Sequence, residues 1–274
     1  MPDPVLHEGA LAPLAPGALV TIGMGSVSVD IAPEAGGRIA QIRHRGIEQL
    51  IGHDESEAMI AWGCYPMAPW AGRIRHGRFD FRGRAVRLPL NLGGHAIHGV
   101  AFTMPWHVDA CSSRHVELSL PLPEDERWPF GGIVHQRIDV ADDLLRMTLS
   151  VTAGDQAMPV TLGWHPWLRK PDQVVFAPSA FYPRDAEGIA TLPLAPPPPG
   201  PWDECFVNQS PVLVHRGDQT LRLTSDCSHW VVYDEPAHAT CIEPQSGPPD
   251  AFNLAQSVLA PGETTRAWFL WEWL

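Results

Sequence analysis

Three segments of this 274-residue chain contain side chains that could exchange protons with a ligand. The first contains Glu243, which ends an apolar run and is followed at once by three prolines and a glycine. Proline fixes φ and disfavours helix for the residue before it, so this pattern predicts a carboxylate held at a strand end by a stiff loop. The other segments place His165 within Gly-Trp-His-Pro-Trp and His98 within the glycine-rich residues 91–99. Two imidazoles and one carboxylate, with no obvious nucleophile, indicate acid–base chemistry.

His95 and His98 form a His-x-x-His pair, a spacing that invites a metal interpretation. In a strand or loop, however, residues i and i+3 point to different faces, and no cluster of cysteine, histidine or aspartate completes a ligand set at the usual spacing. We therefore predict no metal site. The neighbouring Gly93, Gly94 and Gly99 indicate backbone kept bare so that a ligand can approach. We interpret His98 as functional and His95 as a structural histidine.

His165 lies between Trp164 and Pro166, directly after an apolar run. An imidazole among aromatic rings at a strand end has a pKa that is free to move into the neutral range, which suits a proton donor. The alternative is a histidine buried in the core. Beside Glu243, in a chain of net charge −12, we expect the pKa of His165 to be raised. His165 would then set the alkaline limb of a bell-shaped pH profile, and Glu243 the acid limb.

Other polar and aromatic residues near these segments are candidates for holding a ligand. Arg73 follows a glycine-containing turn and could fork onto hydroxyl groups, whereas Arg75 and Arg78 are interpreted as solvated. Asp203 is by default a loop acid. Three tryptophans either stack on the ligand or belong to the core: Trp70, Trp164 and Trp167.

Alternating apolar residues predict that strands position these groups. One hairpin is predicted over residues 134–151, a second over 79–88, a further strand over 116–120 and a C-terminal strand over 265–273. No segment has the apolar period of a packed helix over ten or more residues. The pattern predicts an all-β protein built as a large antiparallel β-sandwich. The proline-rich residues 194–201 are interpreted as a stiff connection rather than a docking peptide.

Composition limits the kind of partner. The chain has 19 basic and 31 acidic residues, which argues against nucleic acid because phosphate backbones are bound through lysine and arginine. The 24 glycines and 29 prolines, beside 45% hydrophobic residues, indicate many turns between short strands rather than disorder. We expect residues 1–274 to form a single domain that binds a neutral small molecule, as a monomer or weak homodimer.

The five cysteines predict a reducing compartment. They are odd in number, widely spaced and never in a Cys-x-x-Cys pair. The first residues lack a basic segment before an apolar one, so we predict no signal peptide. No apolar run approaches the ~20 residues of a membrane-spanning helix. These features favour a cytoplasmic protein that makes no membrane contact.

Taken in order, four segments resemble the aldose 1-epimerase (galactose mutarotase) family from about Val20 to the C-terminus. Residues 71–79 resemble the family's Asn-Arg-Ile…Gly…Phe, and residues 91–99 its Asn…Leu-His-Gly. Residues 163–167 resemble its Gly-x-His-Pro-Tyr-Phe, and residues 243–253 its C-terminal glutamate loop.

The resemblance implies a β-supersandwich with an open sugar cleft and no cofactor. It implies that Glu243 is the general base, His165 the general acid and His98 a second catalytic histidine. The activity implied is interconversion of the α and β anomers of a hexose or related aldose. The predicted substrate-binding residues are Arg73, Asp203, Asn91, Trp70 and Trp167.

Departures from the family pattern concern residues near the substrate. Gly72 replaces the usual asparagine, Leu168 with Arg169 and Lys170 replaces Phe-Asn, and Val100 replaces the second glycine of His-Gly-Gly. The acid–base pair is kept, so the reaction is better supported than the identity of the sugar.

Three alternatives stay open from the sequence. A mutarotase of hexose phosphates would clamp the phosphate with Arg75, Arg169 or Lys170. A glycosidase would need two carboxylates at a set separation. A non-catalytic sugar-binding or sensing protein would keep the cleft and lose turnover, although it has no need of a matched acid and base.

Overall fold

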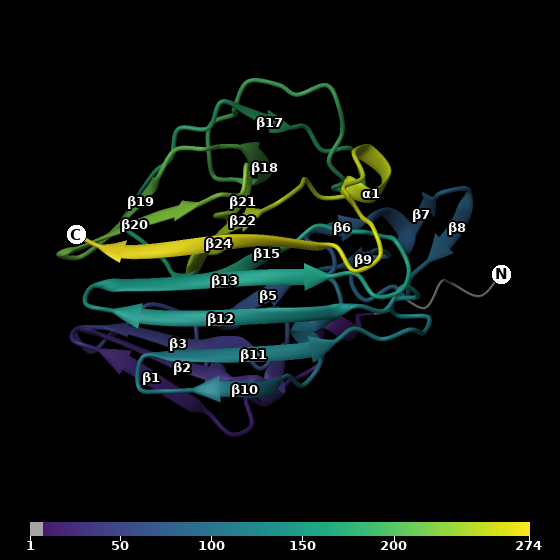
Figure 1. The fold of residues 1–274 in the computed structure, drawn as a ribbon. Coiled ribbons are helices and arrows are strands. Elements are labelled where there is room, and N and C mark those ends of the chain that lie inside the picture. The colour runs from purple at the N-terminus through teal and green to yellow at the C-terminus, as the bar shows by residue number, and fades with distance from the viewer. Residues whose placement is uncertain (1–7) are drawn as a thin grey trace.

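Two large antiparallel sheets form the framework of the protein (Figure 1). The computed structural model describes residues 8–274. The ten-stranded sheet runs in the order β1 (Val20–Met24), β2 (Val27–Ala32), β3 (Arg38–His44), β5 (Cys64–Met67), β15 (Gly163–Arg169), β22 (Ala239–Gln245), β21 (His229–Tyr233), β18 (Asp203–Val207) and β17 (Ala180–Tyr182), with β4 (Ile47–Glu48) paired to β3. The eight-stranded sheet runs in the order β10 (His107–Cys111), β11 (His115–Pro121), β12 (Ile133–Ala141), β13 (Leu144–Thr152), β24 (Thr264–Trp273), β20 (Gln219–Ser225), β19 (Val212–Arg216) and β16 (Gln173–Val175).

Smaller elements connect and cover the sheets. Three two-stranded ladders pair β6 (Arg73–Ile74) with β9 (Ala96–Ile97), β7 (Arg78–Phe81) with β8 (Arg84–Arg87), and β14 (Met158–Pro159) with β23 (Val258–Leu259). The helical elements are short: α1 (Ala251–Leu254) and the 3₁₀ turns η1 (Gly9–Leu11), η2 (Pro33–Ala35), η3 (Arg75–Gly77) and η4 (Ala101–Thr103). None of the helices within residues 8–274 has the length and apolar character that crossing a bilayer requires.

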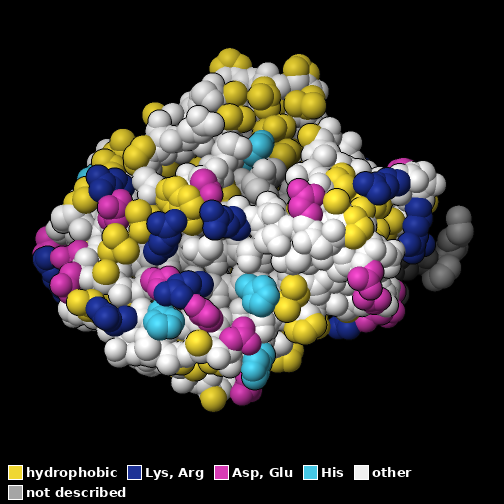
Figure 2. Space-filling view, viewed as in Figure 1, with side chains coloured by type: hydrophobic (Ala, Val, Ile, Leu, Met, Phe, Trp, Pro, Cys, Tyr) yellow, Lys and Arg dark blue, Asp and Glu magenta, His cyan; other side chains and the backbone are white. Residues whose placement is uncertain are grey.

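The predicted all-β sandwich is confirmed, and so are its local hairpins. Strands β12 and β13 form one antiparallel ladder, and β7 and β8 form another around Arg82 and Gly83. The predicted strand over residues 116–120 is part of β11, and the C-terminal strand is β24. On the face of the molecule in Figure 2, basic and acidic side chains are interspersed and no basic patch forms, as expected from the net charge of −12.

The core between the two sheets is filled by alternate residues of their strands. Trp164 of β15, Trp230 of β21 and Ile242 of β22 belong to this core. The indole nitrogen of Trp164 donates to Gln136 of β12 in the facing sheet, which confirms that its side chain points between the sheets. Successive side chains of a strand point to opposite faces, so the residues next to these point outward from the ten-stranded sheet.

A second apolar cluster covers that outer face, under the segments that lead to β6 and β9. It includes Tyr65 and Met67 of β5, Trp167 of β15 and Cys241 of β22. Polar residues of β15 and β22 therefore lie between two apolar layers. The sequence placed His165 and Glu243 at strand ends, but both lie within strands, because core residues alternate with them and continue the ladders.

Candidate active site

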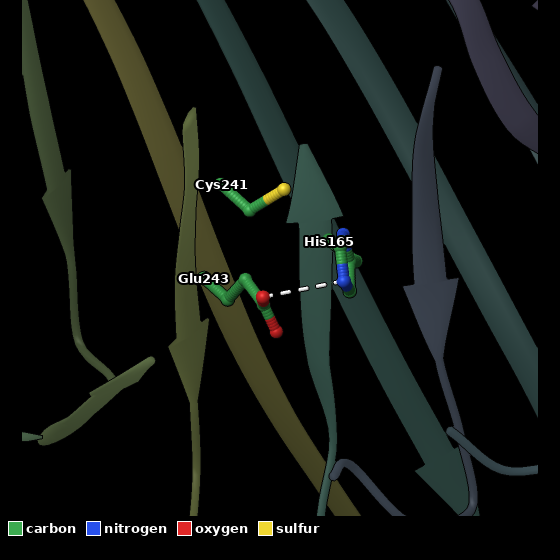
Figure 3. A group of neighbouring side chains, drawn as sticks. All are labelled: His165, Cys241 and Glu243. Atoms are coloured by element: carbon green, nitrogen blue, oxygen red, sulfur yellow. Dashed lines mark ion pairs between the residues drawn. The ribbon is translucent and has the colours of Figure 1, made fainter. Parts of the chain in front are cut away.

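The His165 imidazole and the Glu243 carboxyl group are in contact between neighbouring central strands (Figure 3). The ladder of β15 and β22 pairs Gly163 with Gln245 and Trp167 with Cys241, and this register sets His165 opposite Glu243. The His165 Nε2 atom lies 3.2 Å from the Glu243 Oε1 atom. The residues are 5% and 2% exposed, respectively, so the sheet holds an acid–base pair almost out of water.

Aromatic rings fix the His165 imidazole from several sides. It stacks on Tyr65 with ring centroids 4.8 Å apart and on Trp167 with centroids 5.5 Å apart. The His98 ring meets it edge-on, with centroids 5.0 Å apart and an interplanar angle of 82°. These contacts leave the imidazole little rotational freedom, so its Nε2 atom stays directed at Glu243.

Burial sets the protonation of the pair, and it overturns the expected direction for His165. Desolvation, together with the positive charges of Arg38 and Arg73, lowers the pKa of His165 to about 3. Desolvation, with a further contribution from Asp203, raises the pKa of Glu243 well above its usual value. The carboxyl group facing the imidazole favours the imidazolium, but the loss of water disfavours both charged forms and outweighs this attraction. Between these two pKa values the pair holds one proton.

Gln245 supports the Glu243 carboxylate and was missed by the sequence analysis. Its side-chain nitrogen donates to the Glu243 Oε2 atom at 3.2 Å, and this hydrogen bond lowers the pKa of Glu243 in opposition to burial. Gln245 follows Glu243 by two residues, so the period of a strand places both side chains on one face. That spacing is a signal by which the sequence alone could have identified Gln245.

A pocket of about 340 Å³ opens above the pair. Among the predicted site residues, it is lined by the catalytic candidates and by several predicted substrate-binding residues: His98, His165, Glu243, Arg73, Asp203 and Trp167. Sequence reasoning missed other polar lining residues, including Tyr233 and Glu235. Tyr233 is the last residue of β21, but neither residue belongs to a recognisable motif, so only the tertiary structure reveals them.

Two lining residues of opposite charge face this pocket from different elements. Arg73 begins β6, and its pairing with Ile97 of β9 ties it to the segment that carries His98. Asp203 begins β18 and forms an ion pair with Arg184. A guanidinium and a carboxylate are suited to the donor and acceptor sides of hydroxyl groups.

His98 reaches the pocket through unusual backbone geometry. Its φ is +62°, a left-handed conformation that costs a non-glycine residue free energy. The side chain is buried, and its Nδ1 atom has no hydrogen-bond partner among the described residues. The His95 Nδ1 atom instead accepts a hydrogen bond from the backbone of His76, and the two imidazole rings pack in a tilted arrangement with centroids 5.2 Å apart. His98 therefore lines the pocket, whereas His95 does not.

Gly99 allows this geometry, and its replacement should be costly. A Cβ atom on Gly99 would lie 2.0 Å from the backbone oxygen of Ala68, in addition to the strain of φ +75°. We expect Gly99→Ala to lower the free energy of unfolding by more than about 2 kcal/mol. Denaturant titration measures this, with Gly94→Ala as the control, because Gly94 has φ +79° and no atom within 4 Å of its Cβ position. Equal losses in both variants would contradict the steric argument.

Three predicted ligand-binding or stacking residues lie outside the pocket. The Asn91 side-chain amide donates to the backbone oxygen of Ile97 and accepts a hydrogen bond from its backbone nitrogen. Asn91 therefore shapes the loop instead of contacting the ligand. Trp70 is buried and packs against Trp128 in the core. Trp164 points between the sheets. Sequence motifs located these residues near the site, but strand and loop orientation directs their side chains elsewhere.

The cations proposed for a phosphate clamp are paired away from the pocket. Arg75 forms ion pairs with Asp185 and Glu187. Arg169 pairs with Glu48 and Glu55, and Lys170 pairs with Asp234. None of the three cations lines the pocket. The departures from the family pattern at these positions therefore create surface ion pairs, and Gly72, which does line the pocket, adopts φ +69°.

Comparison with known sequences points to one family. A sequence model described as aldose 1-epimerase matches residues 18–271. Uncharacterized protein YphB of Escherichia coli K12 is 31% identical over 156 residues, which cover 54% of this chain and 51% of that protein. The alignment thus spans about half the length of this curated relative.

Comparison with solved structures supports the fold. A crystal structure from Escherichia coli K12 has a TM-score of 0.82 at 21% identity, covering 94% of this chain and 99% of that one. Galactose 1-epimerase from Lactobacillus acidophilus NCFM has a TM-score of 0.80 at 17% identity, covering 93% and 94% of the two chains. At these identities the likeness establishes a shared fold, the galactose mutarotase-like sandwich. Because the family match also spans nearly the whole chain, the protein belongs to the aldose 1-epimerase family.

Proposed function

We propose that this protein is an aldose 1-epimerase that interconverts the α and β anomers of an unphosphorylated aldose. The observation that carries the proposal is the His165–Glu243 pair, 3.2 Å apart and buried at the base of the pocket. Anomer interconversion removes a proton from the C1 hydroxyl and gives one to the ring oxygen. The open aldehyde then rotates and closes from its other face, so one acid and one base suffice.

A pair holding one proton contains one acid and one base in either arrangement. In the arrangement that burial favours, Glu243 carries the proton and His165 is neutral. Transfer of this proton along the 3.2 Å contact gives a carboxylate and an imidazolium. In that form Glu243 takes the C1 proton and His165 protonates the ring oxygen. When the ring closes, Glu243 returns a proton to the C1 oxygen and His165 takes back the proton from the ring oxygen.

The remaining pocket residues have binding roles in this proposal. His98 has a buried Nδ1 atom without a partner among residues 8–274, and it assists by hydrogen bonding near the ring oxygen. Arg73 and Asp203 hold other hydroxyls, and Trp167 offers a flat apolar surface beside His165. We further propose that the activity resides in a single cytoplasmic domain that needs no cofactor.

The charges that line the pocket favour a free sugar over a sugar phosphate as the substrate. Asp203 and Glu235 line the pocket beside one cation, Arg73, and the three cations suggested for phosphate are engaged in ion pairs elsewhere. A phosphate dianion in this pocket would face more carboxylates than guanidinium groups.

Polarimetry of freshly dissolved α-aldoses tests the proposal. We expect at least one free aldose to lose its initial rotation faster with the protein than without it, and its 6-phosphate to react more slowly by at least about tenfold. Faster decay with the phosphate would favour the hexose-phosphate alternative. Unchanged decay across a broad panel, with sugar binding still measurable by calorimetry, would instead support a binding or sensing protein.

A further inference from the structure

A third buried side chain, Cys241, stands beside the catalytic pair and has no part in the proposed reaction. One ligand atom from each of His165, Cys241 and Glu243 lies within 4.8 Å of the others (Figure 3). Cys241 and Glu243 are two residues apart on β22 and so share a face, and β15 brings His165 against them. A thiol, an imidazole and a carboxylate are the three side-chain types that bind zinc in proteins.

The distances suit a tetrahedral zinc ion. Zinc binds imidazole nitrogen at ~2.0–2.1 Å, carboxylate oxygen at ~2.0–2.2 Å and thiolate sulfur at ~2.3 Å, so neighbouring nitrogen and oxygen ligands lie about 3.3 Å apart. The His165 Nε2 and Glu243 Oε1 atoms are already 3.2 Å apart. Small rotations of the side chains would bring the Cys241 sulfur to its ligand distance. The fourth position would face the pocket, which both His165 and Glu243 line.

The donor set and the surrounding charge select the kind of ion. Sulfur and nitrogen donors favour zinc over magnesium or calcium, which prefer an all-oxygen shell. Asp203 and Glu235 line the same pocket and attract a cation, whereas Arg73 opposes it. Cys64, the neighbouring buried cysteine on β5, belongs to the core between the sheets and so offers no ligand to this group.

We propose that Zn²⁺ binds His165, Cys241 and Glu243 and thereby inhibits the protein. The Cys241 thiol and the protonated member of the pair would each release a proton to water as they become ligands. The bound ion would occupy the acid and the base together. The binding site stands on its own geometry, and only the inhibition rests on the proposed mutarotase activity.

Titration of the EDTA-treated protein with Co²⁺, a spectroscopic substitute for zinc, tests the site directly. We expect one Co²⁺ per chain, with a sulfur-to-cobalt charge-transfer band that Zn²⁺ abolishes by displacement. Cys241→Ala should remove this band and weaken Zn²⁺ binding by at least about 10²-fold. The matched control is Cys64→Ala, which removes an equally buried thiol from the same sheet and should keep the band. Circular dichroism checks folding, and Cys241→Ser replaces Cys241→Ala if the latter does not fold.

Polarimetry with added Zn²⁺ tests the inhibition. The wild type and Cys64→Ala should lose turnover as Zn²⁺ saturates, whereas Cys241→Ala should keep its turnover and need at least about tenfold more Zn²⁺ for inhibition. Absence of a 1:1 complex, or a thiolate band that persists in the Cys241 variants, would overturn the proposed site. Zn²⁺ binding that leaves turnover intact would overturn the inhibition. Lack of turnover without zinc contradicts the proposed function, and the cobalt titration still decides the site.

Discussion

Replacing Glu243 by glutamine is expected to lower kcat by about 10²-fold or more and to leave sugar affinity within a few-fold. The amide keeps the size of the carboxylate and its hydrogen-bond acceptor toward Gln245, but it cannot accept or hold a proton. It also ends proton exchange with His165 across the 3.2 Å contact. Polarimetry measures kcat and calorimetry measures sugar affinity, so the two together separate a loss of chemistry from a loss of binding.

Glu204→Gln is the matched control for this variant. Glu204 lies on β18 in the same sheet, pairs with Arg184 and does not line the pocket. It should retain turnover, because removing a carboxylate there does not touch the acid–base pair. Wild-type turnover in Glu243→Gln would remove Glu243 from the mechanism, and equal losses in both variants would point to a general effect of lost charge.

His165→Asn is expected to cost a similar factor, about 10²-fold or more in kcat/KM, and to change the acid limb of the pH profile. The active form holds one proton on the pair. At low pH this form is lost because His165, whose pKa is lowered to about 3, also becomes protonated, so that the pair holds two protons. At high pH the form is lost because Glu243, whose pKa is raised, gives up the one remaining proton. The wild-type plateau should therefore extend well below pH 6.5, the ordinary pKa of histidine.

The acid and alkaline limbs of the pH profile report the titration of the coupled pair. Each limb should change in the variant that removes the corresponding titrating group. Without the imidazole, the limb near pH 3 should disappear, and the residual activity should rise at high pH as Glu243 ionises to its base form. Profiles of kcat/KM against pH for the wild type and His165→Asn measure this, with circular dichroism confirming that the protein stays folded at low pH. His95→Asn serves as the control, because His95 bonds to the backbone of His76 outside the pocket. A limb near pH 3 that persists in His165→Asn would show that another group sets it.

The local elements of this fold were predictable because their signals are local. Alternating apolar residues identified β11, β12, β13 and β24, and the Arg-Gly turn identified the hairpin of β7 and β8. A strand pattern depends on residues two apart, so it needs no knowledge of distant partners. The resemblance of four ordered segments then indicated the family, which the match over residues 18–271 confirms.

The orientation of side chains within those segments was only partly predictable. His98, Arg73 and Trp167 line the pocket, whereas Asn91 bonds to Ile97 and Trp70 packs in the core. A motif gives the position of a residue in the chain, but the strand or loop it enters decides which way its side chain points. Gln245 could have been predicted, because it lies two residues after Glu243 and so shares its strand face. No such spacing identifies Tyr233 and Glu235.

The sequence by itself determined the residue types of the site and the strands that carry them. Only the tertiary structure decided that His165 lies opposite Glu243, because that pairing depends on the register of β15 with β22, elements separated by more than 60 residues. It also decided the direction of the pKa shifts. Net charge alone predicts a raised pKa for His165, but the two apolar layers around the pair remove water, and desolvation outweighs the attraction between opposite charges.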